Sequence, residues 1–313
     1  MSVFNAEKHL AEAVQSILNQ TYSNFEFIIF EDASTDCSLK ILEEFEASDS
    51  RIILIKNKKN HGAEGFIKNL NLGLKMASGE FIARMDADDI SDINRFEKQV
   101  QFLTENPSIF IVGSYLQLID GEGKHLKIMS APEKDDDIQK KMLKKISLFH
   151  PVLMWRNDEK IFYREKMIAC EDYDLYFRLM NNGYQLANIK EPLLQYRILE
   201  NSISRKNNKM VKWLFVEKAR AFFLEHQQKG VDSYEDFEPE NYFNIFEPDY
   251  KNNVQDLLFA AKFTLKYQNY EELNTILRKA RQYFPHDKRF TMYKLQIKIP
   301  KRILRYFLKF NLK

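Results

Sequence analysis

Residues 80–89 read EFIARMDADD, an apolar run typical of a β-strand that leads into an acidic cluster containing Asp86 and Asp88. A similar run, FEFIIF at residues 25–30, leads into Asp32. In open α/β sheets, ligands bind in the crevice beyond the carboxyl ends of the strands. We therefore expect Asp32 and Asp86 to lie at the same edge of one sheet.

The segments around these two runs alternate between helical and strand periodicity. Helices are predicted within residues 10–18, 39–45, 66–74, 95–106, 138–146 and 171–182, and strands at 25–30, 51–56, 80–85, 110–119, 148–156 and 193–198. Strands separated by helices of this length are typical of βαβ units with right-handed crossovers. The pattern predicts an α/β fold with a mostly parallel sheet flanked by helices.

The strand pattern ends near residue 203. Helical periodicity then continues within residues 212–228, 254–267 and 270–284 and from residue 288 onward. Residues 230–249 contain seven acids and neither Lys nor Arg, and we expect them to form an acidic surface loop. We predict two domains, an α/β domain over residues 1–203 and an α-helical C-terminal region over residues 204–313.

The composition excludes several classes of protein. The 313 residues carry 47 Lys and Arg against 45 Asp and Glu, so there is no basic excess of the kind that nucleic-acid-binding domains show. Two cysteines, Cys37 and Cys170, form neither a disulfide framework nor a metal-binding spacing. No apolar run reaches the roughly 18 residues that cross a bilayer, and the first residues lack a signal-peptide pattern. We expect a cytoplasmic globular protein with no nucleic-acid partner.

Asp86 and Asp88 are candidates for a metal site. Residues i and i+2 of an extended chain point the same way, so both carboxylates could reach one divalent cation or a ribose. Hard oxygen ligands select Mg²⁺ or Mn²⁺. The alternative is an acidic turn whose aspartates cap a helix. Spacing alone leaves both interpretations open, and the same holds for Asp32.

Glu171 and Asp172 begin a predicted helix. Acids at this position interact favourably with the helix dipole, which is the simpler explanation. The functional alternative is a carboxylate placed as general base for an alcohol nucleophile. The basic residues that could face a diphosphate, although most lone basic side chains are solvated, are Lys68, Arg84, Arg95 and Arg197.

Three stretches together resemble the family 2 glycosyltransferases of bacterial capsule, lipopolysaccharide and exopolysaccharide assembly. They are VFNAEKHLAEAVQSILNQTYSNFEFIIFEDASTDCS (3–38), NHGAEGFIKNLNLGLKMASGEFIARMDADDI (60–90) and CEDYDLYFRL (170–179). They occur in the family's order and span about residues 1–200. The resemblance implies a GT-A fold, a Rossmann-like sheet that binds a nucleotide-sugar donor.

The resemblance also implies roles for single residues. Asp32 matches the family carboxylate that reads the nucleobase. Asp86 and Asp88 match its DxD motif, with Asp88 as the main metal ligand. Asp172 matches the catalytic base, with Glu171 beside it.

Three further residues fall in stretches that the family places on the donor side, namely Phe4, Lys68 and Asn71. The implied reaction is an inverting, non-processive transfer of one sugar from a nucleotide-diphosphate sugar, with a UDP-sugar favoured, to a hydroxyl of a glycan or lipid-linked acceptor. Mn²⁺ or Mg²⁺ would stabilise the leaving diphosphate. Asp172 would take the proton of the acceptor hydroxyl.

The chain departs from the family pattern in three places. The family usually has an apolar strand before the segment that begins here at Met1. We therefore expect the first strand to be a stump around Val3, with the natural start upstream. Leu199 stands where many relatives have His, which puts a metal or phosphate contact from that side in doubt. The Q-x-x-R-W motif of processive synthases does not follow Leu193, which favours addition of a single sugar.

Two alternatives remain. A nucleotidyltransferase on a related sheet usually has a Gly-rich N-terminal loop that contains Arg or Lys, and no such loop is present. A non-catalytic GT-A-like subunit could instead scaffold a polysaccharide synthesis complex through its helical region. The short N-terminus keeps this second alternative open, whereas the joint presence of Asp32, Asp86, Asp88 and Asp172 argues against it.

Residues 298–313, KIPKRILRYFLKFNLK, hold six Lys or Arg and no acid. The apolar residues that fall on one side of a helix are Ile303, Leu304, Phe307, Leu308 and Phe310. This pattern is typical of a basic amphipathic helix in a membrane interface, although such a face could also pack on the preceding helices. We expect peripheral contact with the inner face of the membrane through residues 299–313.

Overall fold

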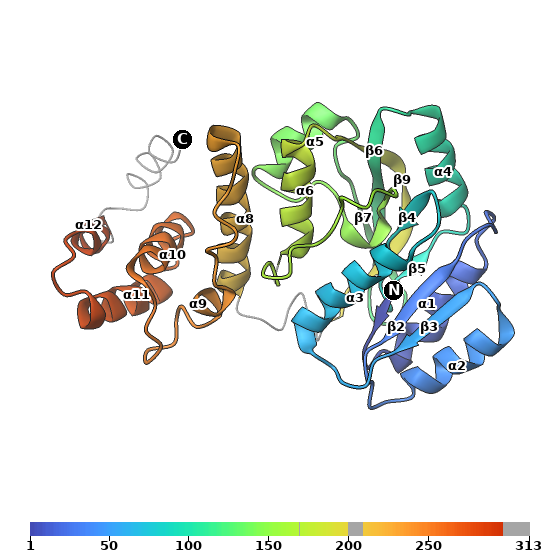
Figure 1. The fold of residues 1–313 in the computed structure, drawn as a ribbon, viewed down its shortest axis with the longest axis horizontal. Helices are drawn as coiled ribbons and strands as arrows, with labels where there is room; N and C mark the ends of the chain where they lie inside the picture. Colours follow the sequence, from blue (N-terminus) through green and yellow to red (C-terminus); the bar gives the residue numbers. More distant parts are fainter. Residues whose placement is uncertain (169, 200–208, 297–313) are drawn as a thin grey trace.

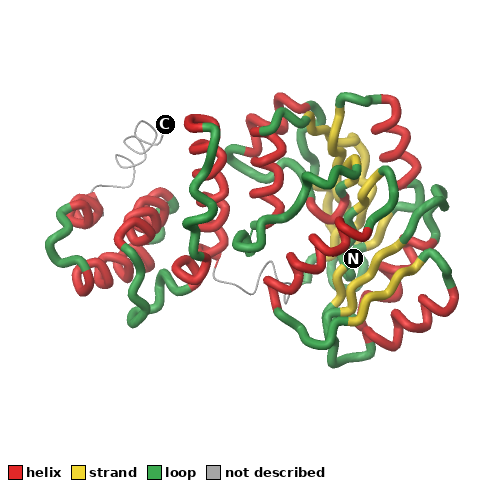
Figure 2. The backbone as a smooth tube through the Cα atoms, in the orientation of Figure 1, coloured by secondary structure: helices red, strands yellow, loops and turns green. Residues whose placement is uncertain are grey.

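The computed structural model describes residues 1–168, 170–199 and 209–296, as an α/β part followed by a group of helices (Figure 1). Figure 2 shows that the strands are confined to the first part. The strands are β1 (Ser2–Val3), β2 (Phe27–Glu31), β3 (Ile52–Lys56), β4 (Phe81–Ala83), β5 (Ile90–Ser91), β6 (Ile109–Ile119), β7 (His125–Met129), β8 (Met154–Arg156) and β9 (Gln185–Arg197). The helices are α1 (Glu7–Leu18), α2 (Ser38–Ser48), α3 (Gly62–Met76), α4 (Arg95–Glu105), α5 (Asp135–Met142), the 3₁₀ turn η1 (His150–Val152), α6 (Glu171–Asn181), α8 (Lys209–Lys229), α9 (Pro239–Phe243), α10 (Val254–Lys266), α11 (Tyr270–Tyr283) and α12 (Arg289–Gln296).

The first sheet is parallel and has the strand order β1-β2-β3. Its apolar side chains, such as Ile29, pack against the buried face of α1, which includes Leu10 and Val14. β1 has two residues, which confirms the predicted stump around Val3. The ammonium group of Met1 extends this pairing, because it donates a hydrogen bond to the carbonyl of Ile28 at 2.9 Å.

The second sheet is mixed, with the strand order β4-β8-β6-β9-β5 and with β7 paired to β6. Within it only β6 and β9 run parallel. The predicted parallel pairing therefore holds for the first sheet and is wrong for most of the second. For β6 and β7 the reason is the short turn at residues 120–124 that joins them, because such a connection makes antiparallel neighbours.

The strands that lead to Asp32 and Asp86 belong to different sheets. Asp32 follows β2 in the first sheet, whereas Asp86 follows β4 in the second. The expectation that both lie at the edge of one sheet is therefore wrong. A cavity of about 540 Å³ lies between the sheets, and residues of both line it, including Ile28, Phe81 and Trp155.

Several predicted boundaries differ from the structure in the middle of the chain. The predicted strand 148–156 is divided into η1 and β8, because Pro151 fixes a turn conformation and lacks a backbone N–H for a strand ladder. β9 begins at Gln185, well before the predicted residue 193. β5 and β7 were not predicted, because both are short strands at the periphery of the sheet whose order depends on tertiary pairing.

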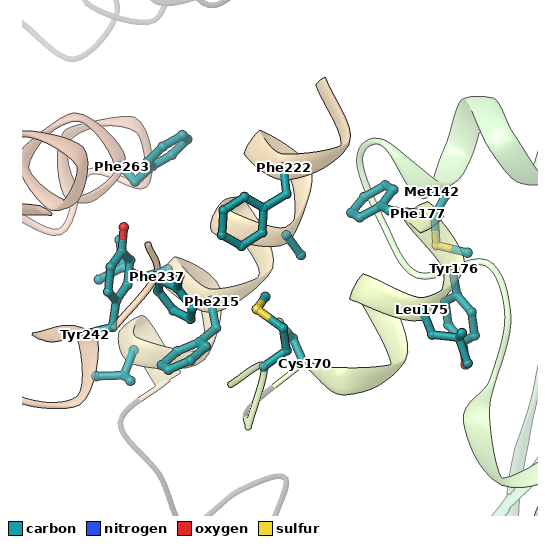
Figure 3. Packing of buried hydrophobic residues seen from close by; sticks show 14 of the residues in the cluster. Met142, Cys170, Leu175, Tyr176, Phe177, Phe215, Phe222, Phe237, Tyr242 and Phe263 are labelled. Atoms are coloured by element: carbon teal, nitrogen blue, oxygen red, sulfur yellow. The ribbon is translucent and has the colours of Figure 1, made fainter. Parts of the chain in front are cut away.

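The helices α8 to α12, here called the helical region, share a hydrophobic core with the second sheet and α6 (Figure 1). In Figure 3, Phe177 of α6 lies opposite Phe222 of α8, and Phe215 continues the packing toward Phe237 and Tyr242. The rings of Phe215 and Phe237 are 5.7 Å apart at their centroids. The helical region is thus packed directly onto the helix that carries Glu171 and Asp172.

The segment over residues 230–249, predicted to be an acidic surface loop, is only partly exposed to solvent. Phe237, Tyr242 and Ile245 are almost completely buried, and α9 forms within the segment. The expectation of a surface loop was wrong because most of its acids face outward, whereas its aromatic side chains enter the shared core and Asp232 is paired inside with Arg164. Counting charges alone could not reveal this division.

Two predictions fall wholly or partly outside the described residues. The basic amphipathic tail at 299–313 belongs to the undescribed end, and the predicted boundary at residues 203 and 204 falls within 200–208. In the ranges that the structure does describe, no helix combines the length and the apolarity needed to cross a bilayer.

Candidate active site

The loop between β4 and β5 carries the predicted residues Asp86 and Asp88. Arg84, which is buried, forms an ion pair from Nη2 to Oδ1 of Asp86 at 2.6 Å. Arg197 of β9 donates from Nε to the backbone carbonyl of Asp88 at 2.9 Å. The loop is thereby fixed from two sides, while the side chains of Asp86 and Asp88 stay partly accessible to solvent.

Two carboxyl groups in this loop, those of Asp88 and Asp89, have raised pKa values. Burial raises the pKa of Asp88 to about 6, and the charge of Asp86 adds to the effect. Burial together with Asp86 and Asp88 holds the pKa of Asp89 well above its usual range. Asp89 accepts a hydrogen bond from the backbone N–H of Arg197 at 2.8 Å, whereas its buried Oδ2 has no hydrogen-bond partner among the described residues. Burial and mutual repulsion therefore disfavour simultaneous ionisation of the acids in this loop.

Glu171 and Asp172 lie in the first turn of α6, as predicted. Burial, and then the charge of Asp172, raise the pKa of Glu171 to about 8. Burial also raises the pKa of Asp172, whose Oδ1 accepts a hydrogen bond from the backbone N–H of Tyr173 at 2.7 Å. Glu171 therefore favours its protonated form at neutral pH, and burial disfavours ionisation of both carboxyl groups. Lys212 of α8 is a further charge that acts on both carboxylates.

The acidic loop and the α6 pair are far apart in the sequence, yet both are influenced by Arg84. Burial is the largest cause of the raised pKa values of Glu171 and Asp172, and the positive charge of Arg84 opposes it at both residues. The negative charge of Asp86 also raises the pKa of Glu171. The structure therefore brings two of the three predicted acidic clusters into one site around a single buried guanidinium.

Asp32 is buried in a polar cradle beyond the end of β2. Its Oδ1 accepts a hydrogen bond from Nδ2 of Asn57, and its Oδ2 accepts one from Nδ2 of Asn60, both at 2.8 Å. Asn57 also donates to Asn69 of α3 at 2.9 Å, and Asn69 donates to the hydroxyl of Ser2 at 3.1 Å. Sequence analysis missed both cradle asparagines, because they come from a polar loop without periodicity.

Phe4 lies beyond the carboxyl end of β1 and is 48% exposed. The next residue, Asn5, has a φ of 47°, and Ala33 beside Asp32 has a φ of 57°. Left-handed conformations of non-glycine residues cost energy and persist where surrounding contacts determine them, often at ligand sites. Here Oδ1 of Asn5 accepts a hydrogen bond from the backbone N–H of Thr35 at 2.8 Å, so the loops after β1 and β2 are locked together.

Lys68 and Asn71 both lie on α3, but they differ in their surroundings. Lys68 is exposed. Asn71 donates from Nδ2 to the carbonyl of Tyr163 at 2.9 Å and accepts from the N–H of Tyr163 at 2.7 Å. Both ends of the Asn71 amide are therefore occupied by the segment before α6. This arrangement fits a positioning role for Asn71 better than a direct contact with the donor.

Two of the arginines that were candidates for phosphate binding form hydrogen bonds within the protein. Arg95 is completely buried and donates to the carbonyl of Arg84 at 2.6 Å. Arg197 is buried as well, and its Nη2 donates to Oε2 of Glu12 at 2.6 Å. The sequence left a diphosphate contact open for both side chains and could not show that they are buried and bonded within the protein.

The chemistry of the acidic loop fits a divalent cation. The carboxylates of Asp86 and Asp88 are hard oxygen ligands of the kind that Mg²⁺ and Mn²⁺ prefer. A bound cation would favour ionisation of Asp88, which burial and the charge of Asp86 otherwise oppose. No group of three His, Cys, Asp or Glu side chains is arranged as a complete metal site in the described ranges. The protein would therefore supply only part of the coordination shell.

Comparison with known proteins identifies the family. The family model described as glycosyl transferase family 2 matches residues 1–164. An uncharacterized glycosyltransferase of Haemophilus influenzae is 37% identical over 219 residues, which cover 66% of this chain and 66% of that protein. The O-antigen biosynthesis glycosyltransferase WbnJ of Escherichia coli is 33% identical over 211 residues, which cover 66% of this chain and 80% of WbnJ. The chain belongs to glycosyltransferase family 2.

Solved structures agree with this assignment at the level of the fold. The structure of S. aureus TarS 1-349 in complex with UDP-GlcNAc has a TM-score of 0.60 and 17% sequence identity, and the match covers 99% of this chain and 85% of that one. The complex of the same protein with UDP has a TM-score of 0.55. The likeness confirms the predicted GT-A fold with a helical C-terminal region.

Replacement of Glu171 by Gln should stabilise the protein increasingly as pH rises. The pKa of Glu171 is about 8 in the folded state and ordinarily 4.5, so the folded state binds more protons between these values and loses stability as pH rises through them. Gln cannot ionise and avoids this loss. We expect the E171Q variant to gain roughly 2–4 kcal/mol over the wild type across this window.

The measurement is the difference in melting temperature between E171Q and the wild type from about pH 4.5 to about pH 8. The exposed Glu191→Gln is the control, and its difference from the wild type should stay flat. A flat difference for E171Q would show that Glu171 ionises normally in the folded protein.

Proposed function

We propose that this chain is an inverting, metal-dependent, non-processive glycosyltransferase. It moves one sugar from a nucleotide-diphosphate sugar to a hydroxyl of a glycan or lipid-linked acceptor in cell-surface polysaccharide synthesis. The observation that carries the proposal is the meeting of Asp86 and Asp172 around Arg84. This arrangement sets a cation-binding loop beside a carboxylate that can accept a proton. WbnJ, whose name assigns it to O-antigen biosynthesis, supports the choice of pathway.

The donor would lie across the ends of the two sheets. Asp32 would accept a hydrogen bond from the nucleobase, and the exposed ring of Phe4 would cover the base or ribose. Lys68 is an exposed cation of α3, and we place it on the donor side. We favour UDP, because the S. aureus TarS structure of similar fold contains UDP-GlcNAc.

The two acidic clusters would divide the chemistry between them. Asp88, with Asp86, would hold Mn²⁺ or Mg²⁺, and a bound divalent ion supplies positive charge for the leaving diphosphate. Asp172 would take the proton of the acceptor hydroxyl while that oxygen attacks the sugar carbon from the opposite face. Glu171, which favours its protonated form at neutral pH, would leave the negative charge of the pair to Asp172. A single displacement requires no covalent nucleophile.

Asp172→Asn should lower kcat by roughly 10²–10⁴-fold, which is what a general base contributes. The KM for the donor and the affinity for UDP should change little, because Asn keeps the size of the side chain. The measurement is UDP release from a panel of UDP-sugars with Mn²⁺, and the matched control is Asp158→Asn in the loop after β8. A D172N variant with normal kcat would disprove the base assignment.

Asp88→Ala should abolish the dependence of nucleotide binding on the metal. Calorimetry should give at least about tenfold weaker UDP binding with Mn²⁺ than for the wild type, because a charge-assisted contact contributes on the order of 1.5–3 kcal/mol. Binding measured in EDTA should be nearly the same for both proteins. Asp49→Ala, which removes an acid at the C-terminal end of α2, is the control. Equal UDP affinity of D88A and the wild type with Mn²⁺ contradicts the metal assignment.

The tail at residues 299–313 supports a peripheral membrane location, since its sequence is basic and amphipathic. Each basic residue near an anionic surface contributes about 1 kcal/mol. Deletion of residues 299–313 should therefore release the protein from phosphatidylglycerol vesicles in a flotation assay and leave its melting temperature unchanged. Vesicles of phosphatidylcholine alone are the control. Continued flotation of the shortened protein, or its unfolding, rejects this location.

A further inference from the structure

The segment just before α6 is tied to the helical region by a buried arginine. Arg164 forms one ion pair from Nη2 to Oδ2 of Asp232 at 2.8 Å and another from Nη1 to Oδ1 of Asp174 at 3.5 Å. Its guanidinium also lies over the ring of Tyr234, 4.4 Å from the ring centroid. Asp232 and Tyr234 follow α8, whereas Asp174 lies in the first turn of α6. A single side chain therefore joins the turn that carries Asp172 to the helical region.

The backbone of the same segment is held by the same part of the helical region. The N–H of Lys166 donates to the hydroxyl of Tyr234 at 3.1 Å, and Nζ of Lys166 donates to the carbonyl of Glu235 at 2.7 Å. A turn then leads toward α6, because the N–H of Met167 donates to the carbonyl of Arg164 at 3.0 Å. The position of the first turn of α6 thus depends on contacts made by residues 232–235.

The opposite end of the segment is fixed to the donor side. Asn71 of α3 holds both backbone groups of Tyr163, the residue before Arg164. The hydroxyl of Tyr163 is 2.8 Å from Nε2 of His150, and both rings are buried. The segment is therefore held by α3 at one end and by the helical region at the other. The α6 carboxylates follow it in the sequence.

The charges in this contact balance only while Asp232 is present. Arg164 and Arg178 face the two carboxylates of Asp174 and Asp232, and the Asp232 side chain is 7% exposed. Without the charge of Asp232, both guanidiniums would share Asp174 alone. A buried charge that loses its partner is strongly unfavourable, so Arg164 would move toward solvent and the segment would move with it.

We propose that Asp232 and Tyr234 are positioning residues that set the catalytic carboxylate of α6, Asp232 through Arg164 and Tyr234 through both Arg164 and Lys166. Residues 232–235 of the helical region would accordingly support the catalytic machinery, whereas the rest of that region would not be required for it. This inference rests on the proposed role of Asp172 as general base. A displacement of a catalytic group by about 1 Å can cost on the order of a hundredfold in rate, so contacts remote from the substrate can control kcat.

The variants Asp232→Asn and Tyr234→Phe test the proposal in the full chain. We expect D232N to lower kcat by roughly tenfold to a hundredfold. Y234F loses only the hydroxyl that accepts from Lys166, so we expect a loss of about threefold to tenfold. The matched control is Glu217→Gln, which removes the charge of another buried carboxylate of the helical region, paired with Arg220 and Lys266. We expect E217Q to keep the wild-type kcat even where it lowers the melting temperature.

The readouts are kcat and KM for UDP release from the UDP-sugar that the wild type turns over fastest, and UDP affinity with Mn²⁺. For D232N, a lower kcat with unchanged UDP affinity supports the proposal. A kcat equal to that of E217Q overturns it. If D232N does not fold, Y234F decides alone, and a wild-type kcat for this variant overturns the proposal.

The double variant D172N/D232N separates this inference from the function on which it rests. If Asp232 acts through Asp172, its replacement costs nothing further once Asp172 is Asn, so the two losses are strongly non-additive. An equal loss from D232N in both backgrounds overturns the positioning role and leaves the base assignment intact. Wild-type turnover of D172N alone overturns the base assignment and the inference with it.

Discussion

The burial of Arg84 is the constraint on which the arrangement of the site depends. Its guanidinium pairs with Asp86 at 2.6 Å and lies over the ring of Phe66, with 5.4 Å to the ring centroid. It also opposes the effect of burial on the carboxyl groups of Glu171 and Asp172. Without this positive charge, acids from β4 and α6 would meet in a poorly solvated space with little to offset their repulsion. The loop after β4 and the start of α6 can approach each other because Arg84 acts on both.

Arg84 and the acidic loop beside it are held in place by residues from several elements. The backbone carbonyl of Arg84 accepts a hydrogen bond from Arg95 at 2.6 Å, which fixes its position. Arg95 in turn donates a hydrogen bond to Gln99. Arg197 holds the acidic loop from β9. On the α6 side, the helical region supplies Lys212 and the contacts to Arg164. The rigidity of the site thus comes from both parts of the chain.

The sequence predicted the elements with strong periodicity and the acids at their ends, but not how those elements pair. Asp86 and Asp88 were singled out because they follow an apolar run, and Asp172 because it begins a predicted helix. All three match family motifs. The assignment of β2 and β4 to two sheets depends on tertiary pairing, which periodicity does not encode. The roles of Arg95 and Asp232 were missed because burial decides them, and an isolated charged residue in a sequence carries no sign of its burial.

A cluster of buried acids without enough compensating positive charge destabilises a fold. Asp88, Asp89 and Glu171 all have raised pKa values, which means that the folded state resists their ionisation and loses stability near neutral pH. Proteins depart from locally favourable sequence choices mainly at functional sites. The two acidic groups contain the residues to which we assign the cation and the proton of the acceptor hydroxyl. The energetic cost of the cluster therefore supports our proposal that this site is catalytic.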